Sequence, residues 1–304
     1  MSTTDPTTAP TTTPVTDQRM NDPAMNADPA TTWSTTATLE QIAARLMHAR
    51  RVLVLTHLKP DGDAAGSTLA ITRAINLAAA GGPGREPPAR VWFAGPLPPW
   101  LDVVAEKTPR GTVPAEGPAP HEDFDAIVIA DTGSWSQLEP VAEWLRKRTD
   151  DTMIIDHHVQ GDPEVAAMRH IDTSAAAACQ PAAELCRILL GKKTIEELPA
   201  AVATPLYLGL ATDTGWFRHS NVDKQVMETA GRLIQAGAEH TRLYAIIEQQ
   251  ETLARLRLLA RSLESTELFE NDQIAVMTIR KRDLSECGAQ PGDSGGFIDH
   301  PQSI

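Results

Sequence analysis

The chain has 304 residues, of which 41% are hydrophobic, so it is long enough for one large core or two modest ones. Its net charge of −13 argues against a protein that holds long duplexes by neutralising phosphates, because that mode needs a concentrated basic surface. The chain shows no apolar run of roughly 18 residues, no signal peptide and an odd number of cysteines, 3, which together predict a soluble, cytoplasmic protein without membrane contact.

The first 36 residues are mostly Thr, Pro, Ala and Asp. They contain too few large apolar side chains to offset the entropy of ordering, so we expect residues 1–36 to form a disordered tail. Thr38 and Gln41 then have the spacing of a capping box, which predicts a helix that runs to about Arg50.

Short apolar runs and helical patterns alternate along the next part of the chain. The apolar runs lie at 52–55, 91–93, 127–129 and 153–155, and the helical patterns lie at about 64–80, 140–148, 174–190, 196–211 and 223–237. This alternation predicts an α/β fold, an open and mostly parallel sheet with helices on both faces. Glycine and proline at 81–88 and 109–120 predict surface loops.

The C-terminal part changes character. We expect a first domain over 37–239, a charged linker helix over 240–262, and an incomplete second α/β domain over 263–304, which has one strand-like run at 274–277. About 40 residues rarely form an independent core.

Four clusters of Asp and His come where a predicted strand or helix ends. They are 57–63, 131–134, 156–158 and 213–215. Each alone is more simply explained as a turn or a solvated polar group. Together they place several carboxylates at one edge of the sheet, where they repel one another unless cations neutralise them. Aspartate and histidine ligands without cysteine favour Mn²⁺, with Mg²⁺ as the alternative.

These four ordered motifs resemble those of the DHH phosphoesterase superfamily over roughly residues 37–235. Within it, the run 212–218 (Thr-Asp-Thr-Gly-Trp-Phe-Arg) makes the chain similar to the nanoRNases, oligoribonucleases that also act on phosphoadenosine phosphate. The resemblance implies a two-metal hydrolase of short oligoribonucleotides and of the 3′-phosphate of phosphoadenosine phosphate. Its partner would be short single-stranded RNA or a small nucleotide, not a long duplex.

The resemblance also implies residue roles. His57 and Asp61 would hold one metal. The second metal would be held by Asp63, His157 and Asp213, and Asp131 would bridge the two metals.

Four further residues would act around the metals. Asp156 would fix a ligand imidazole, and His158 would face the scissile phosphate as donor or proton shuttle. Arg218 is the candidate phosphate clamp, with a surface salt bridge as the alternative, and His219 is a second candidate for substrate binding.

The chain departs from the family pattern in one respect. Relatives carry a substrate-contacting Gly-Gly-His element, whereas the pairs Gly81-Gly82 and Gly295-Gly296 are followed by Pro83 and Phe297. A cyclic-dinucleotide phosphodiesterase, a pyrophosphatase, and a truncated protein that binds metal or nucleotide without catalysis therefore remain alternatives. The sequence leaves the oligomeric state open, with a homodimer among the options.

Overall fold

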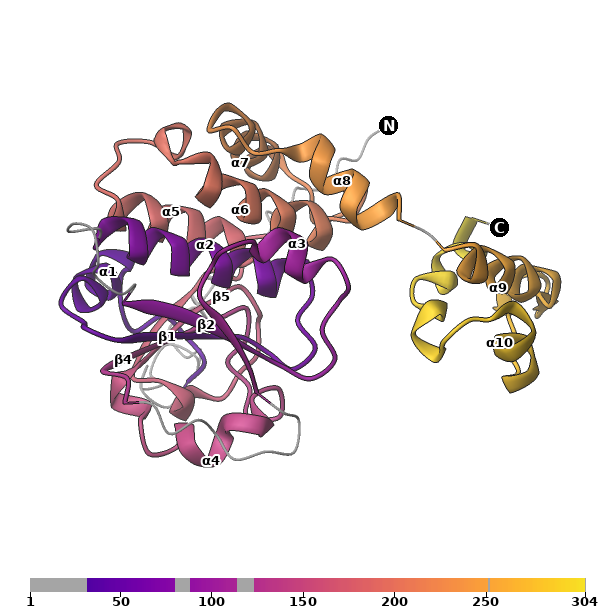
Figure 1. The fold of residues 1–304 in the computed structure, drawn as a ribbon, viewed down its shortest axis with the longest axis horizontal. Helices are drawn as coiled ribbons and strands as arrows, with labels where there is room; N and C mark the ends of the chain where they lie inside the picture. Colours follow the sequence, from indigo (N-terminus) through magenta and orange to yellow (C-terminus); the bar gives the residue numbers. More distant parts are fainter. Residues whose placement is uncertain (1–31, 80–87, 114–122, 251, 304) are drawn as a thin grey trace, which may run out of the picture. The chain divides into compact units, whose positions relative to one another are not determined.

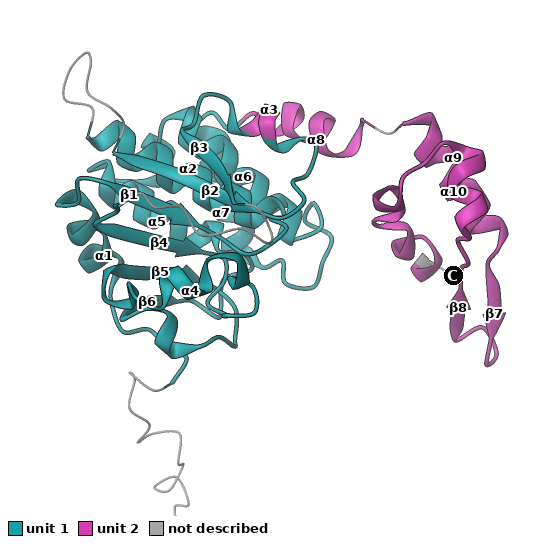
Figure 2. Cartoon of the chain, turned by 60° about the horizontal axis from the view of Figure 1, so that its bottom comes forward, with its two compact units in different colours: residues 1–101, 105–238 teal, residues 102–104, 239–304 magenta. Residues whose placement is uncertain are grey.

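The computed structural model describes residues 32–79, 88–113, 123–250 and 252–303 (Figure 1). Most of the predicted tail, residues 1–31, lies outside these ranges, as do 80–87 and 114–122, which overlap the two predicted loops. The loop prediction for 109–120 is wrong at 110–113, which form a strand. The chain divides into two compact units, residues 1–101 with 105–238, and residues 102–104 with 239–304 (Figure 2).

A six-stranded sheet forms the centre of the first unit, and every strand in it runs parallel to its neighbours. Its spatial order is β3-β2-β1-β4-β5-β6. The strands are β1 Val52–Leu55, β2 Ala89–Ala94, β3 Arg110–Val113, β4 Ala126–Ala130, β5 Thr152–Asp156 and β6 Met168–Ile171. The order reverses between β1 and β4, and ligands of such sheets bind outside the carboxyl ends of the strands at this point.

Helices cover both faces of the sheet, as predicted. The helices of this unit are α1 Leu39–Met47, α2 Gly62–Ala78, α4 Ala142–Leu145, α5 Cys179–Leu189, α6 Ala200–Asp213 and α7 Lys224–Gln235, and α3 Leu101–Ala105 is shared between the units. Figure 1 shows α2 and α5 on the opposite side of the sheet from α4. On the α4 side, Leu138 and Leu145 join Leu53, Ile127 and Ile154 in one buried cluster. The continuous apolar runs of the central strands follow from burial on both faces.

Helices α2 and α6 are joined closely by a glycine and an arginine. A Cβ atom on Gly66 would lie 2.3 Å from the carbonyl oxygen of Pro205, so only glycine allows this approach. Pro205 lies inside α6 and has no amide to donate to the carbonyl of Ala201. Arg73 of α2 donates Nη1 to that carbonyl at 2.7 Å. The proline thus creates an acceptor that ties the two helices together.

The tail prediction is wrong for residues 32–36, which lie along the edge strand β6. The backbone amide of Thr36 donates to the carbonyl of Arg169 at 2.8 Å, and the Thr35 hydroxyl donates to the carbonyl of Ile171 at 3.0 Å. The capping box that follows is confirmed, because Thr38 and Gln41 exchange side-chain and backbone hydrogen bonds at the start of α1.

The second unit contains three helices and a hairpin among its described residues. They are α8 His240–Glu248, α9 Leu253–Glu264, α10 Lys281–Cys287, β7 Glu267–Phe269 and β8 Ile274–Val276. The segment 240–262, expected as one linker helix, thus holds α8 and most of α9. Leu258, Cys287, Ala289 and Phe297 form a small buried cluster.

All three cysteines are free and buried. No helix in the described part of the chain combines the length and the apolar character that a membrane crossing needs.

Candidate metal centre

Three strand ends deliver the first residues of the site. His57 follows β1, Asp131 comes directly after β4, and β5 ends at Asp156, immediately before His157 and His158. These strands are neighbours in the sheet, so their carboxyl ends place the five side chains at one edge, on either side of the point where strand order reverses.

Helix α2 contributes two carboxylates from its first turn. Asp61 is the N-cap, and its Oδ1 accepts the amides of Asp63 and Ala64, each at 3.0 Å. Asp63 is fully buried (0% exposed) because α6 comes close at Gly209, where a Cβ atom would lie 2.6 Å from the carboxylate oxygen Oδ1 of Asp63. Asp213, the last residue of α6, is then brought to the same site.

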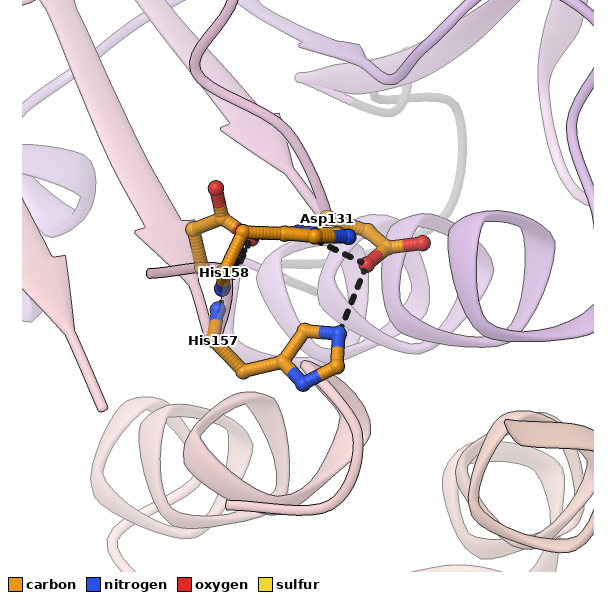
Figure 3. Close-up of side chains that lie close together, drawn as sticks. Asp131, His157 and His158 are labelled. Atoms are coloured by element: carbon orange, nitrogen blue, oxygen red, sulfur yellow. Dashed lines mark hydrogen bonds and ion pairs between the residues drawn. The ribbon is translucent and has the colours of Figure 1, made fainter. Parts of the chain in front are cut away.

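The carboxylate of Asp131 lies between two groups of donor atoms. Its Oδ2 is 3.5 Å from His57 Nε2, and its Oδ1 is 3.4 Å from His157 Nε2. Asp131 has a backbone φ of 64°, a left-handed conformation that is uncommon outside glycine and that Asp and Asn adopt more readily than most residues. Figure 3 shows the rings of His157 and His158 approaching the same oxygen of Asp131.

Three groups of side chains among the described residues could hold a metal ion, and one of them is Asp131 with Asp156, His157 and His158. The other two contain only proposed metal ligands. In one, donor atoms of His57, Asp61 and Asp131 all lie within 4.8 Å of one another, and in the other the same holds for Asp63, His157 and Asp213. The structure therefore brings together all six residues that the sequence proposed as metal ligands. We call His57, Asp61 and Asp131 the Asp61 group, and Asp63, His157 and Asp213 the Asp63 group.

Backbone carbonyls orient both imidazoles. His57 Nδ1 lies 3.0 Å from the carbonyl of Leu58, and His157 Nδ1 lies 3.2 Å from the carbonyl of Ala175. A proton on each Nδ1 satisfies that carbonyl and leaves Nε2, which faces the carboxylates, free to act as a ligand. Metal-binding histidines are commonly fixed in this way.

The electrostatics of the site favour bound cations. Burial and repulsion from Asp131 and Asp213 raise the pKa of Asp63 well above its ordinary value. Burial and repulsion from Asp131 raise the pKa of Asp213 to about 6. Burial opposes the charge of His57, but hydrogen bonds with Asp131 and Asp61 prevail and raise its pKa to about 10. Without metal, imidazolium protons must neutralise part of the carboxylate charge.

Asp156 and His158 lie at the same edge in different surroundings. Asp156 is fully buried, and its Oδ1 accepts the amide of His157 at 2.8 Å and lies 2.8 Å from His158 Nδ1. The side chain of His158 is 53% exposed. The hydrogen bond with Asp156 outweighs desolvation and raises the pKa of His158.

The two residues proposed to bind substrate are not drawn into the cluster. Arg218 and His219 are exposed, and Arg218 donates Nε to the carbonyl of Gly215 at 2.7 Å. The His219 ring lies over Gly215, where a Cβ atom would be 2.2 Å from Nε2. Within the described ranges, neither side chain forms a hydrogen bond or ion pair with the six clustered residues.

Sequence reasoning missed the amides that hold Asp63. The backbone N–H groups of Ala178 and Cys179, at the start of α5, donate to its two carboxylate oxygens. The predicted helix at 174–190 was the only signal, since the first amides of a helix are free to bind an anion. The hydrogen bond from the indole of Trp33 to the carbonyl of His158 was missed as well, because Trp33 falls in the segment expected to be disordered.

The model of the DHH family, N-terminal domain, matches residues 51–210, more than half of the chain. The chain therefore belongs to the DHH family, a class of metal-dependent phosphoesterases. The match covers β1 to most of α6 and so includes every clustered residue except Asp213.

Two curated relatives are similar to this chain. The bifunctional oligoribonuclease and PAP phosphatase NrnA of Thermus thermophilus is 30% identical over 196 residues, which are 62% of this chain and 51% of that protein. The Bacillus subtilis protein of the same name is 25% identical over 258 residues, 81% of this chain and 72% of that protein. The chain thus spans about half the length of the Thermus relative.

A solved structure confirms the predicted fold. An exopolyphosphatase-related protein from Bacteroides fragilis superposes with a TM-score of 0.75 at 18% identity, covering 88% of this chain and 76% of that one.

Proposed function

We propose that this chain is a two-metal phosphoesterase that hydrolyses short oligoribonucleotides and removes the 3′-phosphate of phosphoadenosine phosphate. The observation that carries the proposal is the position of Asp131, whose two oxygens face different donor groups at 3.5 Å and 3.4 Å. The names of the relatives from Thermus and Bacillus support the choice of substrates.

The donor atoms suit hard divalent cations. Each group combines carboxylate oxygens with one imidazole Nε2 and contains no thiolate, a set that favours Mn²⁺, with Mg²⁺ as the alternative. In our assignment His57 and Asp61 hold one cation, Asp63, His157 and Asp213 hold the other, and Asp131 touches both. Two cations held there would supply the positive charge that activates a water molecule and stabilises charge on the phosphate.

The chain's own residues position the proton donor. Because Nδ1 of His158 is engaged with Asp156, its Nε2 is left to donate to a phosphate oxygen or to the leaving oxygen. Asp156 holds the ring and, by raising the His158 pKa, keeps the donor protonated to higher pH. Arg218 and His219 would contact a second phosphate or the end of a short strand.

The charge of the chain supports a small substrate. With a net charge of −13, the protein offers little attraction to a long phosphate backbone, whereas cations at a compact site can bind one or two phosphates strongly.

A substrate panel tests the proposal. The purified chain would be assayed with added Mn²⁺ on RNA of two to five nucleotides, phosphoadenosine phosphate, cyclic diadenylate and pyrophosphate. We expect the first two to be hydrolysed fastest and chelator to abolish the activity. Clear preference for the cyclic dinucleotide or for pyrophosphate would replace the substrate assignment, and metal binding without any turnover would indicate a non-catalytic protein.

A further inference from the structure

A short segment before the first helix is tied to the edge of the sheet. We call residues 32–36 the strap. Besides the contacts of Thr35 and Thr36 described above, the amide of Arg169 donates to the Thr36 hydroxyl at 2.9 Å, and the amide of Ile171 donates to the Thr35 hydroxyl at 2.9 Å. The strap therefore covers polar backbone groups of β6 that an edge strand would otherwise expose.

The buried side chain of Arg169 donates hydrogen bonds to the backbone of the strap. Arg169 is 1% exposed, and its guanidinium donates to the carbonyls of Ser34 and Thr32, each at 3.3 Å. The same guanidinium donates to the carbonyl of Pro163 at 2.6 Å, in the segment that follows the DHH motif. Buried donors need acceptors, so the strap belongs to the folded unit and is not an appendage.

The strap places Trp33 against both loops that carry the central residues of the site. Its indole Nε1 donates to the carbonyl of His158 at 2.9 Å. Its ring also occupies the space beside two glycines, since a Cβ atom would lie 1.8 Å from the ring at Gly133 and 2.6 Å from it at Gly161. Gly133 lies two residues after Asp131.

The two loops are also joined to each other. The amide of Asp162 donates to the carbonyl of Gly133 at 2.8 Å, and the carboxylate of Asp162 accepts the amide of Trp135 at 2.7 Å. Trp33, partly buried on the core cluster beneath them, packs against this junction. A rigid indole at such a place restricts both backbone segments at once.

We propose that Trp33 is a positioning residue that fixes the peptide of His158 and the loop after Asp131 in the geometry that the site needs. The inference rests on the proposed function for its catalytic consequence. Its structural part, the ordering of the two loops, is independent of it. The hydrogen bond to the carbonyl of His158 sets the direction of that peptide, and hence of the ring held by Asp156. The indole against Gly133 supports the residue that follows the left-handed turn at Asp131.

Two substitutions separate the contacts of the indole. Trp33→Phe keeps most of the ring but loses the N–H donor, and Trp33→Ala loses both. Trp144→Phe is the matched control, because Trp144 packs partly buried on the same core cluster from α4, beside Arg148. For each variant we would measure thermal midpoint, kcat and KM with phosphoadenosine phosphate, Mn²⁺ affinity by calorimetry, and hydrogen exchange of residues 131–134 and 156–162 without metal.

We expect Trp33→Ala to lower kcat about tenfold and Trp33→Phe about threefold, with KM within about twofold, as for a small misplacement of reacting groups. Exchange of both loops should rise and Mn²⁺ affinity should fall in Trp33→Ala, while Trp144→Phe changes none of these. Unchanged exchange and unchanged Mn²⁺ affinity in Trp33→Ala would overturn the proposal, as would a rise in KM alone, which would mean that the indole contacts substrate. If the parent chain hydrolyses nothing on the panel, the proposed function fails, whereas exchange and Mn²⁺ affinity still decide the role of Trp33.

Discussion

Nδ1 of His158 lies 2.8 Å from Oδ1 of Asp156, so a half-exposed imidazole is anchored on a fully buried carboxylate. The same oxygen accepts the amide of His157, which carries a donor atom of the Asp63 group. One buried carboxylate thus orients the proposed proton donor and one proposed metal ligand together.

Replacing this carboxylate by an amide tests the role of the pair. Asp156→Asn should reduce kcat by about 10- to 100-fold, because general acid catalysis typically contributes 10²–10⁴ and the ring loses its orientation. Asp156 raises the pKa of His158, so the variant lowers it, and the alkaline limb of kcat should move to lower pH. A complete pH profile of kcat provides the measurement. An alkaline limb that stays in place would remove His158 as the proton donor.

The bridging position of Asp131 is best probed with asparagine. Asn tolerates the left-handed φ of 64° and keeps the shape, so the variant should fold while losing turnover. Removing one carboxylate also relieves repulsion, and the thermal midpoint of the metal-free protein should not fall. Activity and midpoint would be measured beside Asp123→Ala, an exposed carboxylate before β4. A rate above about one tenth of the parent, a loss under about 1.4 kcal/mol in barrier, would exclude a bridging ligand.

Metal uptake should become tighter as pH rises. Burial opposes the charge of His157, but its hydrogen bond with Asp131 prevails and raises its pKa to about 9, while burial and repulsion raise the pKa of Asp213 to about 6. Between these values a cation must displace the imidazole proton. Calorimetric Mn²⁺ titrations in buffers of different ionisation enthalpy would give both the affinity and the number of protons released. An affinity that is constant over this range, with no proton release, would show that His57 and His157 are not ligands.

The stability of the metal-free protein should fall as pH rises. The pKa of His57 is raised from 6.5 to about 10 in the folded protein, so its contribution is complete below the unfolded value and is lost as pH rises through the folded one. The raised pKa values of Asp63 and Asp213 act in the same direction. Thermal midpoints with and without saturating Mn²⁺ would check this expectation. A thermal midpoint of the metal-free protein that increases between pH 6.5 and about 10 would contradict this expectation.

Arg218 remains a prediction as a phosphate ligand. Its Nε is engaged with the carbonyl of Gly215, which leaves the two terminal nitrogens to form a fork with phosphate. Arg218→Ala should raise KM about tenfold, the equivalent of about 1.4 kcal/mol, and leave Mn²⁺ affinity unchanged. Arg187→Ala, which removes a partly buried arginine paired with Glu184, serves as the control. Equal KM values for parent and Arg218→Ala on every phosphate substrate would exclude Arg218 as a phosphate ligand.

Within the sheet, the strands that could be predicted from sequence are those buried on both sides. The four predicted strands became β1, β2, β4 and β5, whose central residues are continuous apolar runs. The edge strands β3 and β6 were missed because they lack such runs. β6 reads Met-Arg-His-Ile, and its buried Arg169 donates to carbonyls of the strap as well as to that of Pro163. A pattern of neighbouring residues contains no information about acceptors more than a hundred positions away.

The residues of the site also divide into those that could be located from the sequence and those that could not. Residues that a strand end or a helix start places directly, such as His57, Asp131 and Asp61, could be located because the fold itself brings those ends together. The amides of Ala178 and Cys179 could not be recognised, since backbone donors have no side-chain signature. Trp33 could not be found either, because its neighbours in sequence indicate disorder and its partners come from other loops.

Asp61 and Asp63, which belong to different donor groups, differ sharply in access to solvent. The side chain of Asp61 is 60% exposed, whereas that of Asp63 is fully covered and lies against the locked pair of helices α2 and α6. A cation bound by the Asp61 group would have one ligand, Asp61, that is open to exchange with water, whereas a cation bound by the Asp63 group would have one ligand, Asp63, that water does not reach. The two positions should therefore differ in residence time, and protein purified without added metal should retain the inner ion long after the outer one has equilibrated with the buffer.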